Sequence, residues 1–203
     1  MIIEKSAALL RWVYPQALWR IAPTDRAVYL TFDDGPIPEA TPFILETLER
    51  YDAHATFFMV GDNARRYPQL LEEVRRRGHR IGNHTFHHLG GLRHSADEYL
   101  ADTLQADELL HTDLFRPPHG WMQYNQYRCL RQRFRIVMWD VLTRDYSRSL
   151  TAQDVLDNVK RYTRPGSIIT FHDSLKSIDK LHTALPQALE WLRANDYEFR
   201  TIE

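Results

Sequence analysis

Two adjacent carboxylates, Asp33 and Asp34, directly follow an apolar run at residues 27–32 that predicts a buried strand. On an extended backbone the two side chains point in different directions, so one can bind a cation while the other takes a proton. Because neighbouring carboxylates repel each other, the pair itself indicates a metal ion or an arginine nearby. Taken alone, the stretch 33–36 (Asp-Asp-Gly-Pro) is also good turn chemistry, and a turn is the simpler interpretation of it.

His84 and His88 are four residues apart, a spacing that places both rings on one face of a helical turn. Two neutral imidazoles and one carboxylate make a three-ligand metal site that leaves room for water, and zinc is the usual ion for such ligands. The metalloprotease motif His-Glu-x-x-His is absent because Thr85 replaces the glutamate, so the general base must come from elsewhere, with Asp33 as the candidate. His87 could replace His88 geometrically, although a supporting or surface role is simpler for it.

Further ionisable groups follow other predicted strands. They are Arg116 with Pro117-Pro118-His119-Gly120 after a short strand near Leu114, Asp140 and Asp145 after the strand 134–139, and His172-Asp173 after the strand 167–171. In folds built from parallel strands the chemistry is located at the carboxyl ends of the strands. We therefore expect these groups to share one cleft.

The segments between these groups alternate between strand and helix. Further strands are expected at residues 55–60, 79–83 and 197–202, and helices at 41–51, 68–78, 95–111, 151–162 and 178–194. Thr41 before Pro42, Ser95 with Glu98, and Thr151 are the expected helix N-caps. This alternation predicts an α/β fold with a parallel sheet or barrel inside and helices outside.

In this order, the motifs resemble those of the polysaccharide deacetylases, the NodB-homology domains of carbohydrate esterase family four. They are Thr31-Phe32-Asp33-Asp34-Gly35-Pro36, His84-x-x-x-His88, Arg116-Pro117-Pro118-x-Gly120, Trp139 with Asp145-Tyr146, and Thr170-Phe171-His172-Asp173. The resemblance spans roughly residues 27–202. It implies a distorted (β/α) barrel, a divalent metal (usually Zn²⁺, with Co²⁺ or another divalent ion as alternatives), and a hydrolase that removes N-acetyl groups from carbohydrate containing N-acetylglucosamine.

The resemblance also implies a role for each site residue. Asp33 is the base, Asp34, His84 and His88 are the metal ligands, His172 is the acid, Arg116 holds the base, and Asp145 tunes the charged groups. Pro118, His119, Trp139, Tyr146 and Thr170 are the expected substrate-binding positions. His119, Tyr146 and Thr170 stand where the family usually has Tyr, Trp and Leu. At the position of His119 the family residue acts mainly through its backbone N–H, which His119 keeps. Tyr146 and Thr170 affect the acyl and sugar preference.

Length and charge limit the remaining function classes. A chain of 203 residues is expected to form one domain, with residues 1–26 as an N-terminal extension packing on it. Its formal net charge of −1 argues against a nucleic-acid partner. No run of about 18 apolar residues exists, which argues against a membrane span. The single cysteine, Cys129, cannot form an intrachain disulfide.

The N-terminal segment allows two interpretations. Residues 5–20 mix basic with apolar side chains, as an interfacial helix on a membrane does. Packing on the domain is the simpler interpretation, because Pro15 interrupts the pattern. Arg11 ends the apolar run too early for a signal peptide, so a cytoplasmic location is expected. A deacetylase or deformylase of a lipid-linked sugar, and an inactive sugar-binding homologue, are the alternative functions; the oligomeric state is left open.

Overall fold

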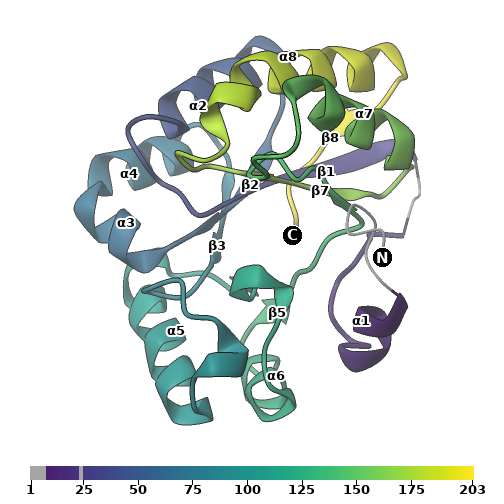
Figure 1. Ribbon diagram of the computed structural model, residues 1–203. Helices are drawn as coiled ribbons and strands as arrows, with labels where there is room; N and C mark the ends of the chain where they lie inside the picture. Colours follow the sequence, from purple (N-terminus) through teal and green to yellow (C-terminus); the bar gives the residue numbers. More distant parts are fainter. Residues whose placement is uncertain (1–7, 23–24) are drawn as a thin grey trace.

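The computed structural model describes residues 8–22 and 25–203 (Figure 1). Its strands are β1 (Ala27–Asp33), β2 (Ala55–Met59), β3 (Arg80–Asn83), β4 (Leu114–Phe115), β5 (Arg135–Ile136), β6 (Val141–Leu142), β7 (Ile168–His172) and β8 (Glu198–Phe199). Its helices are α1 (Ala8–Val13), α2 (Thr41–Arg50), α3 (Gly61–Arg66), α4 (Pro68–Arg76), α5 (Ala96–Leu110), α6 (Tyr124–Leu130), α7 (Ala152–Tyr162) and α8 (Ile178–Ala194), with short 3₁₀ turns η1 (Gly91–Arg93) and η2 (Pro118–Gly120).

The strands form one curled parallel sheet with the helices packed outside it (Figure 1). Their order is β5-β4-β3-β2-β1-β7-β6, and β8 pairs with the first residues of β1. The expected distorted (β/α) barrel is confirmed, and its sheet forms a curled half-barrel. In register, Asp33 at the end of β1 lies opposite His172 of β7 and Phe58 of β2, while Met59 of β2 lies opposite Asn83 of β3. The carboxyl ends of these strands therefore bring the candidate catalytic groups to one edge.

The central strands are held by aromatic packing on their outer face. Every residue of β1 is buried, as expected of a central parallel strand covered on both sides. The ring of Phe32 stacks on Phe57 of β2 at 5.1 Å and on Phe171 of β7 at 5.6 Å, measured between ring centroids. Stacked rings on three adjacent strands fix the relative positions of the strand ends that follow them.

Most expected elements are present, and the differences have local causes. The capping box of Ser95 with Glu98 and the N-cap Thr151 are confirmed, and Thr151 forms a capping box with Asp154 as well. Thr41 as an N-cap is wrong: it is the first helical residue, and its hydroxyl accepts from the N–H of Ile37 and donates to Asp173. The expected strand 134–139 is reduced to β5, and α3, α6 and β6 were not predicted because they are short and have little apolar periodicity.

The segment before β1 completes the barrel wall between β5 and β7. The N–H of Leu18 donates to the carbonyl of Ile136 at 2.7 Å, and the N–H of Met138 donates to the carbonyl of Leu18 at 2.8 Å. The N–H of Ile21 donates to the carbonyl of Gly166 at 3.0 Å. This segment is thus bonded to two parts of the barrel that the sheet itself does not join.

The same segment buries its aromatic side chains on the domain. Tyr14 and Trp19 are 0% and 6% exposed, whereas Trp12 is 80% exposed. Tyr14 and Trp19 therefore pack this segment on the domain. Residues 5–7 of the stretch 5–20 lie outside the described part of the chain. No helix among residues 8–22 and 25–203 is long and apolar enough to cross a membrane.

We expect Trp19→Ala to lower the free energy of unfolding by about 3–5 kcal/mol, because it leaves a cavity against Trp139 and removes the hydrogen bond from Trp19 Nε1 to the carbonyl of Tyr14. The matched control is Trp12→Ala, which should change the free energy of unfolding by less than about 0.5 kcal/mol because the Trp12 ring is exposed. Urea unfolding of both variants measures this; equal effects would contradict a structural role for the segment.

Candidate active site

Asp33 is the last residue of β1 and is held by a buried arginine. Arg116, 1% exposed, donates from Nη1 to Asp33 Oδ1 at 2.6 Å and to Thr31 Oγ1 at 2.7 Å. Its other amino group donates to the carbonyl of Met138 at 2.7 Å, and its guanidinium lies over the ring of Phe58 at 4.2 Å. These contacts fix one carboxylate oxygen of Asp33 against the barrel interior.

Asp34 points away from Asp33 because the chain turns sharply after β1. Its φ is +83°, a left-handed conformation that carboxylate residues tolerate better than most. Asn63 of α3 donates to the Asp34 carbonyl at 2.8 Å, and the Asp34 N–H donates to the carbonyl of Phe58 at 3.2 Å. The Asp33 carboxylate thus faces Arg116, whereas the Asp34 carboxylate faces His84 and His88.

His84 and His88 both face Asp34. His84 Nε2 is 3.7 Å and His88 Nε2 is 3.2 Å from Asp34 Oδ1. His84 Nδ1 lies 2.7 Å from the carbonyl of Arg116, and because a carbonyl can only accept, the ring proton is on Nδ1 and the Nε2 lone pair is free to bind a cation. These three residues form the one group of metal-ligating side chains found within the described part of the chain.

The protonation of His84 and Asp34 suits a cation. Burial lowers the pKa of His84 to about 4, against the opposing effect of the Asp33 charge, so the ring is neutral at pH 7. Burial alone would raise the pKa of Asp34, but a hydrogen bond from His88 and the charge of His172 outweigh it and hold that pKa below its usual value. A neutral imidazole and an ionised carboxylate are among the donors that Zn²⁺ prefers.

The histidines do not lie on a helical turn, contrary to the expectation from their spacing. Thr85 and His88 have φ values of +62° and +56°, so the chain forms an irregular loop. Asp102 of α5 supports it: Oδ2 accepts from the N–H groups of Phe86 and His87 at 2.8 and 3.0 Å, and Oδ1 lies 2.5 Å from His87 Nδ1. His87 therefore supports the loop from outside the trio.

Sequence reasoning missed Asp102 because it lies inside a helix with no motif around it, although it is 6% exposed. We expect Asp102→Ala to weaken metal binding by about 10–100-fold, as loss of groups that orient ligands generally does. Asp97→Ala, an exposed position in the first turn of the same helix, should leave it unchanged. Competition against a chelator measures both; equal affinities in the two variants would show that Asp102 does not support the site.

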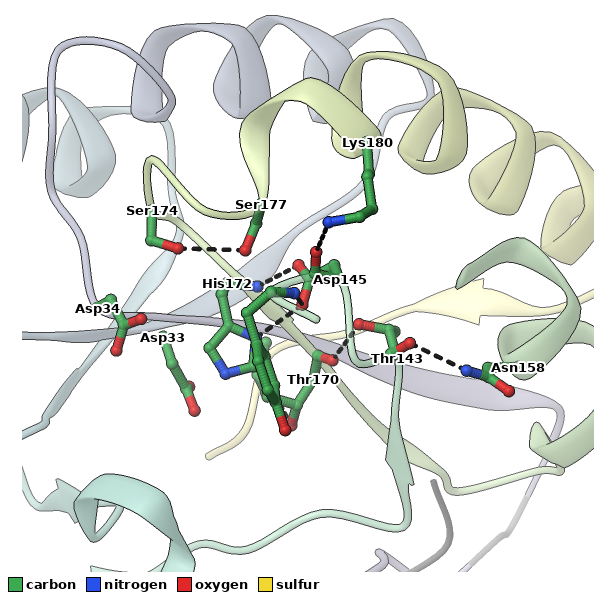
Figure 2. Close-up of polar contacts among 12 residues, drawn as sticks. Asp33, Asp34, Thr143, Asp145, Asn158, Thr170, His172, Ser174, Ser177 and Lys180 are labelled. Carbon is green, nitrogen blue, oxygen red and sulfur yellow. Dashed lines mark hydrogen bonds and ion pairs between the residues drawn. The ribbon is translucent and has the colours of Figure 1, made fainter. Parts of the chain in front are cut away.

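His172 lies on the other side of Asp33 and is bound by Asp145 (Figure 2). Asp145, fully buried, accepts from the His172 N–H at 2.7 Å and from His172 Nδ1 at 2.8 Å. Burial lowers the pKa of His172, but the charge and hydrogen bond of Asp145, together with the charges of Asp34 and Asp33, raise it to about 9. The ring is therefore a proton donor at neutral pH.

The expected substrate-binding residues surround these groups in different ways. The ring of His119 stands edge-on to His88 at 4.9 Å, and Tyr146 stands edge-on to His172 at 4.6 Å. Pro118 is buried beside His119. Trp139 is 9% exposed and packs on Gly120 so closely that a Cβ there would lie 2.2 Å from the ring.

Thr170, the fifth of these residues, is only 1% exposed. Its hydroxyl is 3.1 Å from that of Thr31, which also receives a hydrogen bond from Arg116. Thr170 is thus linked to the arginine that holds Asp33. Thr31, which joins them, lies in the motif that contains Asp33, but the sequence did not indicate this linking role.

Two other carboxylates at predicted strand ends lie away from this cluster. Asp140 as a cleft residue is wrong: its N–H bonds to Ile168 at the start of β7, the opposite end from His172. Its carboxylate pairs with Arg11 and Arg164 at 2.8 Å each, so it ties the N-terminal segment to the barrel. Asp173 is fully buried behind the site, where its Oδ2 accepts from Thr41 at 2.7 Å.

Comparison with known proteins agrees with this geometry. The polysaccharide deacetylase profile matches residues 20–132. A peptidoglycan-N-acetylglucosamine deacetylase of Bacillus cereus is 35% identical over 189 residues, covering 87% of this chain and 68% of the relative. A chitooligosaccharide deacetylase of Azorhizobium caulinodans is 33% identical over 162 residues, covering 76% of this chain and 77% of the relative. The chain therefore belongs to the polysaccharide deacetylase family.

Solved structures give the same result for the fold. The crystal structure of a peptidoglycan N-acetylglucosamine deacetylase bound to a naphthyl N-oxidanyl-benzamide superposes with a TM-score of 0.85 at 32% identity, covering 94% of this chain and 93% of that one. The family is one of hydrolases that act on amide bonds of polysaccharides, and this chain is an enzyme of that class. A pseudoenzyme of the family from Bacillus anthracis has the same fold at 23% identity and a TM-score of 0.82, so the fold alone does not carry the activity.

Proposed function

We propose that the chain is a metal-dependent N-deacetylase of glycans that contain N-acetylglucosamine. The observation that carries this proposal is the arrangement at the strand ends: a three-ligand cation site at Asp34, His84 and His88, with Asp33 and His172 beside it. Asp33 is positioned as the base and His172 as the acid. Hydrolysis of an amide needs both, since water must lose a proton and the leaving nitrogen must gain one.

The proton transfers are assigned to this chain's own residues. Asp33, fixed by Arg116, takes the proton of the water that attacks the acetyl carbon. His172, whose Nδ1 is bound to Asp145, gives the proton of Nε2 to the sugar nitrogen, which departs as an amine. The products are acetate and a glucosamine unit. The backbone N–H of His119 is the proposed donor to the oxygen that becomes negative during attack.

The cation is proposed to be Zn²⁺, with Co²⁺ or another divalent ion as the alternative. Asp34, His84 and His88 would hold it through one carboxylate oxygen and two Nε2 atoms, and it would supply Lewis-acid polarisation of the acetyl carbonyl. The lone pair freed on His84 Nε2 and the lowered pKa values of His84 and Asp34 support this assignment.

The relatives support the glycan class of the substrate, since they are named as peptidoglycan and chitooligosaccharide deacetylases. Acetate release from peptidoglycan, chitooligosaccharides and a lipid-linked N-acetyl sugar, each with the zinc-loaded protein, tests the proposal. Release from a glycan supports it. Release from the lipid-linked sugar alone would favour the rival substrate, and release from none would favour an inactive sugar-binding homologue.

We expect a bell-shaped dependence of the rate on pH, because Asp33 must be ionised and His172 protonated. The pKa of His172 is raised to about 9, so the acid form persists through neutral pH and the rate falls as the pH rises through that value. Asp145→Asn removes the charge that raises this pKa and should move the basic limb to lower pH. Rates from pH 5 to 10 measure this; an unchanged basic limb in Asp145→Asn would exclude Asp145 as the group that tunes His172.

A further inference from the structure

Side chains from two helices hold the loop that carries Asp145 (Figure 2). Lys180 of α8 donates from Nζ to the backbone carbonyl of Asp145 at 2.7 Å. Asn158 of α7 donates from Nδ2 to the carbonyl of Thr143 at 3.1 Å. Both donors are half-buried. They anchor the main chain on either side of Arg144.

The main chain between these anchors is in an unfavourable conformation. Arg144 has φ +60°, the left-handed region that residues with a Cβ rarely adopt. The N–H of Ser147 closes the turn by donating to the Arg144 carbonyl at 2.9 Å. A backbone in such a conformation persists only when its surroundings hold it. Lys180 and Asn158 supply that support from outside the loop.

We propose that Lys180, assisted by Asn158, is a positioning residue for the proposed acid: it holds Asp145, which in turn holds His172. This inference rests on the proposed function. The carboxylate of Asp145 binds the N–H and Nδ1 of His172. The backbone carbonyl of Asp145 binds Lys180, which lies eight residues after His172 in the chain. The segment from His172 to Lys180 therefore contacts both the carboxylate and the backbone carbonyl of Asp145, as Figure 2 shows.

The charged groups that act on His172 are Asp145, Asp34 and Asp33. Lys180 contacts the main chain of Asp145, so its effect on the ring passes through that residue. If the loop relaxes, the carboxylate moves from Nδ1 and its hydrogen bond weakens. The pKa of His172 then falls relative to the parent, because Asp145 is the largest of the influences that raise it.

Lys180→Met keeps the apolar stem and removes the ammonium. We expect kcat to fall roughly tenfold, since misplacement of a reacting group by about 1 Å can cost up to about 10²-fold. KM should not change, and the basic limb should move to lower pH by less than in Asp145→Asn. Asn158→Leu should have a smaller effect, because a neutral donor at longer distance is weaker. Lys160→Met, on the exposed face of α7, is the control and should leave the profile unchanged.

A double-mutant cycle separates positioning through Asp145 from a general structural effect. In the Asp145→Asn background, Lys180→Met should lower kcat by less than about twofold, because the interaction it serves is already lost. A full tenfold loss in that background would overturn the proposal, as would an unchanged basic limb in the single variant.

A titration of the His172 ring by NMR, with the zinc-loaded protein and no substrate, gives a second test that does not depend on turnover. The pKa of His172 should be lower in Lys180→Met than in the parent, and unchanged in Lys160→Met. Identical pKa values in the parent and Lys180→Met would overturn the positioning role. Failure of the proposed function would instead appear as no acetate release by the parent, whatever the NMR result.

Discussion

Asp33→Asn should bind metal almost as the parent does and lose about 10²–10⁴-fold in kcat, the contribution expected of a positioned general base. The amide has the shape of the carboxylate and can still accept from Arg116, but it cannot take a proton from water. The proposed ligands Asp34, His84 and His88 are unchanged in this variant. Zinc content by elemental analysis and the rate of acetate release, measured on the same sample, test both halves of the expectation.

The matched control for Asp33→Asn is Asp173→Asn. Asp173 is also a buried carboxylate at the end of a central strand, but its Oδ2 bonds to Thr41 behind the site. The Asp173→Asn variant should therefore retain most of the parent's turnover. Full activity in Asp33→Asn would assign the base role to another group, and loss of metal in that variant would mean that Asp33, too, binds the cation.

His88→Ala should lose metal and activity together. Removal of a group that merely orients a ligand costs about 10–100-fold in metal affinity, so removal of one of three ligands should cost more than about 10²-fold. His84→Ala should behave in the same way, with an added loss of stability because His84 is 2% exposed.

His87→Ala separates the two neighbouring histidines. His87 Nδ1 is bound to Asp102, and two backbone N–H groups still bind Asp102 when the ring is removed. Metal affinity should fall far less than in His88→Ala. Equilibrium dialysis against zinc measures all three variants; metal retained in His88→Ala and lost in His87→Ala would show that the ligand assignment is wrong.

The fold, and the gathering of the candidate site residues at one edge of the sheet, could be predicted because these residues occur in local patterns. Buried strands end in Asp33-Asp34 and His172-Asp173, and a parallel sheet brings such ends together. Asp140 does not follow this rule, since the strand before it is interrupted and Asp140 lies beside the start of β7, the end opposite His172. Position after an apolar run indicates the site edge only when the strand really extends to that residue.

The supporting residues could not be predicted from local pattern. Asp102 and Lys180 act on backbone groups that are distant in the sequence, and their own neighbours form no motif. Thr31 belongs to the motif that contains Asp33, but its hydroxyl contacts to Thr170 and Arg116 join residues distant in the sequence. The loop that carries His84 and His88 shows the same limit: their spacing suited a helical turn, but two left-handed residues and the Asp102 carboxylate bring the rings together instead.

The central claim is that one cation site and its neighbouring acid and base hydrolyse N-acetyl groups. The most direct measurement follows acetate release and bound zinc together, using chitooligosaccharide and peptidoglycan, before chelation, after it, and after zinc is restored. We expect one zinc per chain, acetate released in step with new free amines, loss of both on chelation and recovery of both with zinc. Acetate release that continues at full rate in the metal-free protein, or no release from either glycan at full zinc occupancy, would contradict the account.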